Sequence, residues 1–123
     1  MEELPIIVEE KGNIRILYFT IEKLTDILII DQIKSYILSV ITGGGRIILI
    51  NFAGIEYMSS SFLSVLIAMK KSLYQVKGKA CLCCLSGNIA RLFSITELDK
   101  IFDIFHSESD ALEFLQTFSD QID

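Results

Sequence analysis

The chain alternates between short apolar runs and breaks made of glycine or polar residues. Two runs, Pro5–Glu10 and Ile14–Thr20, flank a Lys-Gly-Asn turn sequence, which predicts an antiparallel β-hairpin. In Asp26–Thr42 the apolar residues recur at helical spacing with polar residues between them, so this segment predicts a helix. Gly43 suits the left-handed position that ends such a helix.

Strands and helices alternate in the rest of the chain. Arg46–Phe52 is apolar on successive residues, which is typical of a strand covered on both faces. The later elements are expected to be a helix over Ser60–Lys77 that Gly78 ends, a strand over Ala80–Leu85, a helix over Asn88–Thr96, a strand over Ile101–Phe105 and a helix over Glu108–Phe118. Right-handed crossovers place the later strands parallel in one sheet. The pattern predicts a single α/β domain over residues 1–123, with an N-terminal hairpin, alternating parallel strands in a mixed β-sheet, and about four helices.

The composition raises the question of a membrane segment, because mean hydropathy is +0.50. The longest uncharged run, Tyr57–Met69, is shorter than the roughly 20 residues that a spanning helix needs, so no span is expected. The net charge of −5 disfavours direct binding to nucleic acid. The first residues do not resemble a signal peptide, and three cysteines leave at least one thiol unpaired. We therefore expect a cytoplasmic protein.

The sequence predicts neither an enzyme nor a metal or cofactor site. Cys81 and Cys84 would point to opposite faces of a strand, and a zinc site would lack ligands, so buried inert thiols are expected at Cys81, Cys83 and Cys84. His106 is the one histidine and has no partner at the spacing of a known motif. We interpret it as a loop residue facing solvent.

Three consecutive serines, Ser59, Ser60 and Ser61, fall where the helix after the central strand begins. One serine there would cap the helix, which is worth ~1 kcal/mol. Three in a row also fit a phosphoacceptor site, because a helix start carries roughly half a positive charge and offers free backbone N–H groups to a phosphate. Both interpretations are open on the residues alone.

The junction Gly-Ile-Glu-Tyr-Met-Ser-Ser-Ser-Phe-Leu, placed between a strand and an apolar helix, resembles the STAS domain of bacterial anti-sigma factor antagonists. The hallmark of that family at this point is Met-Asp-Ser-Ser/Thr-Gly-Leu. The resemblance continues in residues 85–86, 91–93, 98–102 and 109–112, and it covers essentially the whole chain.

The resemblance implies a protein-binding switch. Such a protein binds an anti-sigma factor that is also a serine kinase, and sigma factor is released; phosphorylation abolishes binding and a phosphatase restores it. Alignment of Met58 and Leu63 with the family motif implies Ser61 as the phosphoacceptor, with Ser60 and Ser59 as alternates. The implied partner-binding residues are Glu22, Asp26, Tyr57, Met58, Ser59, Ser60 and Phe62.

The chain departs from the family pattern at several positions. Ser59 stands where the family has Asp, and Phe62 stands where it has Gly. Ile21–Leu24 lacks the acidic residue of the family's Gly-Glu-Leu/Ile-Asp unless Asp26 substitutes for it.

Two alternative functions therefore stay open. One is a divergent STAS scaffold without a phosphate cycle, as a homodimer or part of a signalling complex, in which Phe62 anchors the interface. The other is a STAS module that binds an apolar small ligand.

Overall fold

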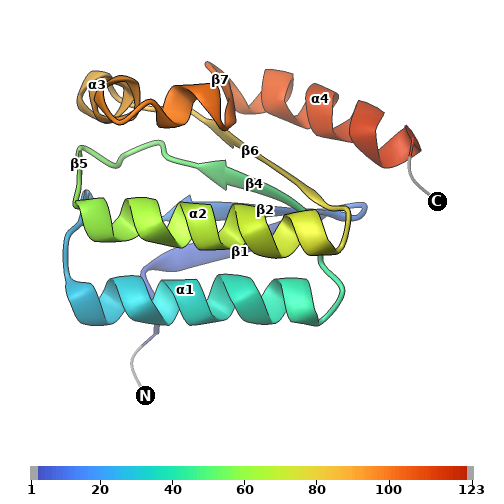
Figure 1. Ribbon diagram of the computed structural model, residues 1–123, viewed down its shortest axis with the longest axis horizontal. Coiled ribbons are helices and arrows are strands. Elements are labelled where there is room, and N and C mark those ends of the chain that lie inside the picture. The colour runs from blue at the N-terminus through green and yellow to red at the C-terminus, as the bar shows by residue number, and fades with distance from the viewer. Residues whose placement is uncertain (1–2, 122–123) are drawn as a thin grey trace.

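Figure 1 shows the computed structural model of the chain, which describes residues 3–121. The strands are β1 (Ile6–Lys11), β2 (Ile14–Phe19), β3 (Lys23–Leu24), β4 (Ile47–Asn51), β5 (Tyr57–Met58), β6 (Lys79–Cys83) and β7 (Asp103–Phe105). The helices are α1 (Ile27–Thr42), α2 (Ser60–Gln75), α3 (Gly87–Ile95) and α4 (Glu108–Gln121), with a short 3₁₀ helix, η1 (Leu98–Lys100). The predicted α/β class is confirmed.

Five strands form the main sheet in the order β1-β2-β4-β6-β7. β1 and β2 pair antiparallel, and β2, β4, β6 and β7 pair parallel, which confirms the hairpin followed by parallel strands. All five residues of β4 are buried, as expected for a central strand. α1 and α2 lie side by side over one face of the sheet, and α4 packs on the other face (Figure 1).

A second, two-stranded sheet joins the loop after β2 to the loop after β4. β3 and β5 pair parallel through Lys23 with Tyr57 and Leu24 with Met58. The hydrophobic pattern does not predict these strands, because two residues are too few to show an alternation. The pairing holds the start of α1 and the start of α2 at the same edge of the molecule.

The left-handed residue that follows α1 and α2 is one position away from the predicted glycine, and α2 ends at Gln75 and α4 at Gln121 instead of the predicted Lys77 and Phe118. Gly43 has φ −81°, and Gly44, with φ +108°, takes the left-handed position after α1. After α2 that position belongs to Lys77, with φ 57°, and not to Gly78. The N–H of Gly78 then donates to the carbonyl of Leu73 at 2.7 Å, which completes a Schellman motif.

Candidate functional site

The candidate site is the edge of the molecule where α1 and α2 begin, formed by residues 22–28 and 56–61, which we call the helix-start edge. Both helices begin on the left in Figure 1. The N–H groups of Glu56 and Tyr57 donate to the carbonyl of Glu22 at 2.8 and 3.2 Å, and the N–H of Ser59 donates to that of Leu24 at 3.0 Å. These bonds bring together the two sequence segments from which most of the predicted site residues come.

The three serines occupy different environments at the start of α2. Ser59 is the N-cap residue, but its side chain makes no capping hydrogen bond, and its Oγ is buried without a partner among the described residues. Ser60 is exposed and Ser61 is half-buried. The first N–H groups of any α-helix lack partners within it, and the first turn of α2 contains no acidic residue. This helix start can therefore accept an added negative group.

Asp26 has a clear structural task at the start of α1. Its Oδ1 accepts hydrogen bonds from the N–H groups of Leu28 at 2.9 Å and Ile29 at 3.2 Å. The carboxylate therefore caps the helix and also places a negative charge at its positive end. Asp26 and Glu22 are both exposed, as a partner-binding role requires.

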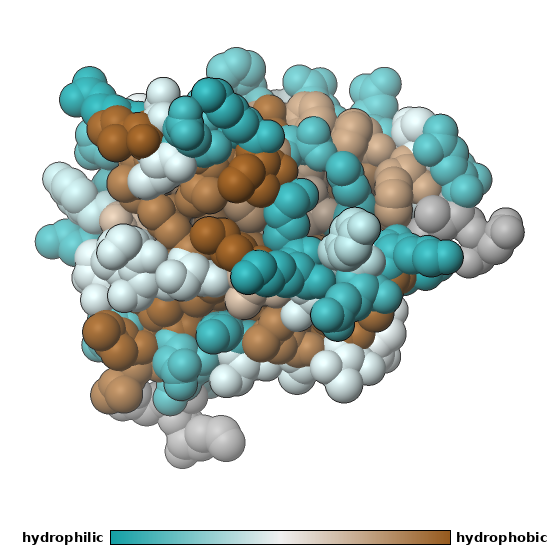
Figure 2. Space-filling model, in the orientation of Figure 1, coloured by the Kyte–Doolittle hydropathy of each residue, from teal (hydrophilic) through white to brown (hydrophobic). Residues whose placement is uncertain are grey.

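Apolar side chains are exposed beside the serines. Ile27 is 67% exposed, Leu28 75% and Tyr57 55%. The Nζ of Lys23 lies 5.5 Å from the centre of the Tyr57 ring. Figure 2 shows apolar atoms at the lower left, where α1 begins. The partner-binding residues predicted from the sequence include Tyr57 but not Ile27 or Leu28. The available signal was that these two residues fall outside the buried stripe of α1.

Phe62 does not belong to this exposed edge. Its side chain is 0% exposed, and its ring lies 5.9 Å from that of Phe19 and 6.2 Å from that of Phe52, both edge to face. The expectation of an exposed Phe62 that contacts a partner or anchors a dimer is wrong. The physical reason is helical periodicity, which puts Phe62 on the buried face of α2 with Val65 and Leu66. Met58 is half-buried and packs against the same core.

A buried amide fixes the loop that leads to the serines. Asn51, 6% exposed, accepts a hydrogen bond from the N–H of Ala53 through Oδ1 at 2.8 Å. Its Nδ2 donates to Oε1 of Glu108 on α4 at 2.9 Å. Gly54 follows with φ +89°, a conformation that glycine adopts without strain. Asn51 thus ties the loop between β4 and β5 to α4.

The other candidate groups do not form a reactive site. Cys81 and Cys83 are buried as expected, and Cys84 is half-buried. Burial raises the pKa of the Cys81 thiol to about 12 and also raises that of Cys83. His106 is exposed. Residues 3–121 contain no cluster of histidine, cysteine and acidic residues that could hold a metal. No helix in this part of the chain is long and apolar enough to cross a membrane.

Comparisons with known proteins converge on one family. The STAS domain model matches residues 5–111. BtrV of Bordetella bronchiseptica, named as a candidate anti-sigma factor antagonist, is 26% identical over 87 residues, which cover 71% of this chain and 75% of BtrV.

Two solved structures illustrate the similarity of fold. A candidate anti-sigma factor antagonist from Thermotoga maritima superposes with a TM-score of 0.83 at 22% identity, covering 90% of this chain and 94% of that one. The Bacillus cell-fate determinant SpoIIAA in its phosphorylated form gives a TM-score of 0.71 at 20% identity, with coverage of 89% and 98%.

Proposed function

The chain belongs to the STAS domain family, and we propose that it acts as an anti-sigma factor antagonist. In this role it binds a kinase-type anti-sigma factor in the cytoplasm, and sigma factor becomes free to direct transcription. The observation that carries the proposal is the position of three serines at the start of α2, beside exposed apolar side chains, in a chain of this family. The name of BtrV and the phosphorylated form of SpoIIAA support it.

The helix-start edge has the composition of a protein-binding surface. Ile27, Leu28 and Tyr57 supply exposed apolar contact area, and aromatic residues are enriched in interfaces. Glu22 and Glu56 are exposed at the same edge and add negative charge around this area. A partner that presents an apolar patch with cationic groups around it matches this surface.

Phosphorylation of Ser61 would switch this surface off. The Ser61 Oγ attacks the γ-phosphorus of ATP, the bond from that phosphorus to the bridging oxygen breaks, ADP leaves, and the kinase takes the hydroxyl proton. The phosphate adds about −1.5 to −2 charges. The start of α2 stabilises this charge, so the fold persists while the anion repels or blocks the docked partner. Because Phe62 points into the core, its ring does not obstruct access to the serines from outside.

The test is a phosphorylation assay with an anti-sigma factor kinase from the same genome and Mg-ATP, read by mass spectrometry. We expect the parent, Ser59→Ala and Ser60→Ala to gain one phosphate and Ser61→Ala to gain none. The phosphorylated parent should no longer bind the anti-sigma factor, and treatment with a phosphatase should restore binding. If Ser61→Ala gains phosphate as the parent does, the assignment of Ser61 is wrong. If the unphosphorylated parent does not bind the anti-sigma factor, the antagonist role is wrong.

A further inference from the structure

A groove of about 610 Å³ lies between the second half of α2 and the segment that joins η1 to β7. Its apolar lining comes from Ile67, Leu73, Tyr74, Ala80, Ile101 and Phe102. We call it the α2–β7 groove. Figure 2 shows brown apolar atoms in the band between α2 and the segment from η1 to β7, which lies above α2 in this view. At 1.5 Å per helical residue, Tyr74 lies about 20 Å along α2 from Ser61, so this groove is separate from the helix-start edge.

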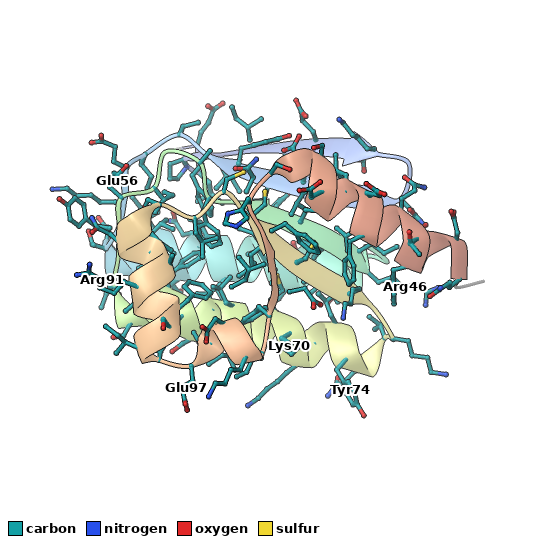
Figure 3. The ribbon with its side chains drawn as sticks, turned by 90° about the horizontal axis from the view of Figure 1, so that it is seen from above. Arg46, Glu56, Lys70, Tyr74, Arg91 and Glu97 are labelled. Carbon is teal, nitrogen blue, oxygen red and sulfur yellow. The ribbon has the colours of Figure 1, made fainter. Side chains whose placement is uncertain are left out.

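The side chains on the walls of the groove leave apolar area in water. Tyr74 is 85% exposed, Ile101 47% and Ile67 37%. Figure 3 shows Tyr74 and Lys70 on the second half of α2. A concave apolar site of this size is within the range of about 300–1,000 Å³ in which proteins bind small molecules.

The charged residues of the groove are all cationic. Lys70, Lys71 and Lys79 line it and no acidic residue does, although the chain has 16 acidic and 11 basic residues. Lys79 is paired with Asp103 at 2.9 Å, whereas Lys70 and Lys71 take part in no ion pair within residues 3–121. The Nζ of Lys70 lies 5.5 Å from the centre of the Phe102 ring, so its charge stands next to the apolar lining.

We propose that the α2–β7 groove binds one medium-chain carboxylate, with its alkyl tail over Ala80, Ile101 and Phe102 and its carboxylate at Lys70 and Lys71. The apolar lining selects the tail, because each buried methylene raises affinity about fourfold. The two lysines select an anionic head. The ligand is a free acid and not a membrane surface, since the groove is concave and the chain carries a net charge of −5, which an anionic bilayer repels.

The first arm of the test is isothermal titration calorimetry of the parent with hexanoate, decanoate and decanol. Decanoate should bind at one site and about tenfold more tightly than hexanoate, because a half-open groove buries only part of each added methylene. Decanol should bind more weakly than decanoate. If decanoate shows no saturable binding, or if decanol matches it, the proposal fails.

The second arm uses variants of exposed lysines. Lys70→Glu should weaken decanoate about tenfold and leave decanol unchanged. Lys11→Glu makes the same change of charge at the end of β1 and should leave decanoate affinity as in the parent. An equal loss in both variants would show an effect of net charge alone and overturn the proposal. Circular dichroism verifies that both variants are folded.

The third arm separates other occupants of the groove. The parent should not sediment with vesicles of phosphatidylglycerol, and it should remain a monomer at the concentrations used for calorimetry. Binding to vesicles without binding to decanoate, or a dimer that Ile101→Asp dissociates, would overturn the assignment. Ser61→Glu should bind decanoate like the parent, so failure of the phosphorylation switch and failure of this proposal are distinguishable.

Discussion

The ring of Phe62 meets the ring of Phe52 edge to face, with centroids 6.2 Å apart and planes at 89°. Both side chains are fully buried. The contact joins the first turn of α2, which contains Ser60 and Ser61, to the loop that follows β4. Phe19 and Phe93 extend the cluster, since each also packs against Phe52. The position of the candidate phosphoacceptor therefore depends on an aromatic core and not only on local helix capping.

Phe62→Ala should destabilise the protein by about 3–5 kcal/mol, because it leaves a cavity among these rings. Urea denaturation measures the free energy of unfolding. Tyr57→Ala is the matched control, because Tyr57 is also aromatic but lies on β5 and is 55% exposed, so its loss should cost no more than about 0.5 kcal/mol. Equal effects of the two substitutions would contradict the assignment of Phe62 to the core.

The hydrophobic pattern predicted α1, β4 and α2 around the site, but neither the short strands β3 and β5 nor the exposed surface of the site. The stripe of α2 that begins at Phe62 could be read from its spacing, and this spacing describes the ring correctly. The resemblance to the family motif instead implied that Phe62 contacts a partner and is therefore exposed. A motif gives the order of residues along the chain and not the direction of their side chains. In the structure, the position of Phe62 on the buried face of α2 sets the direction of its side chain.

The features that the sequence did not predict depend on contacts between residues far apart along the chain. The pairing of Leu24 with Met58 joins residues far apart in sequence, and neither two-residue strand has a pattern of its own. Ile27 and Leu28 are apolar, so their types suggested burial, yet they lie before the stripe of α1 makes contact with the sheet. The spacing places both residues outside the buried stripe, but their degree of exposure depends on how α1 packs.

The two helix starts should respond differently to the loss of their N-cap side chains. Asp26→Ala removes an acceptor for two N–H groups and should cost about 1 kcal/mol. Ser59→Ala removes a buried hydroxyl that has no partner and should cost less than about 0.5 kcal/mol or stabilise the protein. Thermal or urea unfolding distinguishes these outcomes. A larger loss for Ser59→Ala than for Asp26→Ala would contradict the capping geometry.

The end of α2 offers a stabilising substitution. Lys77 has φ 57°, a left-handed conformation that is unfavourable for a residue with a Cβ atom, so Lys77→Gly should stabilise the protein by about 1 kcal/mol. Gly78→Ala is the opposite case, because a Cβ there would meet the Arg46 carbonyl and come within 2.8 Å of Leu73 Cδ2. It should cost about 1–3 kcal/mol. Urea denaturation tests both, and a stabilising Gly78→Ala would show that the contact with Arg46 relaxes freely.

The buried thiol of Cys81 should make stability fall in alkali. Its pKa is about 12 in the native state against an ordinary value of 9.0, so from pH 9 upward the unfolded chain loses this proton while the native chain keeps it. Unfolding then releases a proton, and the free energy of unfolding decreases between pH 9 and about 12. By pH 10 this one group should account for a loss of about 1 kcal/mol. Urea denaturation of the parent and Cys81→Ala at pH 8 and 10 measures the difference; parallel losses in both would contradict it.

The exposed apolar residues of the helix-start edge should govern partner binding without governing stability. Leu28→Asp places a charge where Leu28 is 75% exposed, at the start of α1, where an acidic residue suits the helix dipole. It should weaken binding to the anti-sigma factor at least tenfold, as expected when an apolar contact at the centre of an interface is lost. Ile95→Asp is the comparison variant, since Ile95 is 73% exposed and is the last residue of α3, outside residues 22–28 and 56–61 that form this edge. Surface plasmon resonance on both variants, with thermal unfolding as a check of the fold, tests the location of the surface. Equal affinities of Leu28→Asp and the parent would place the partner elsewhere on the molecule.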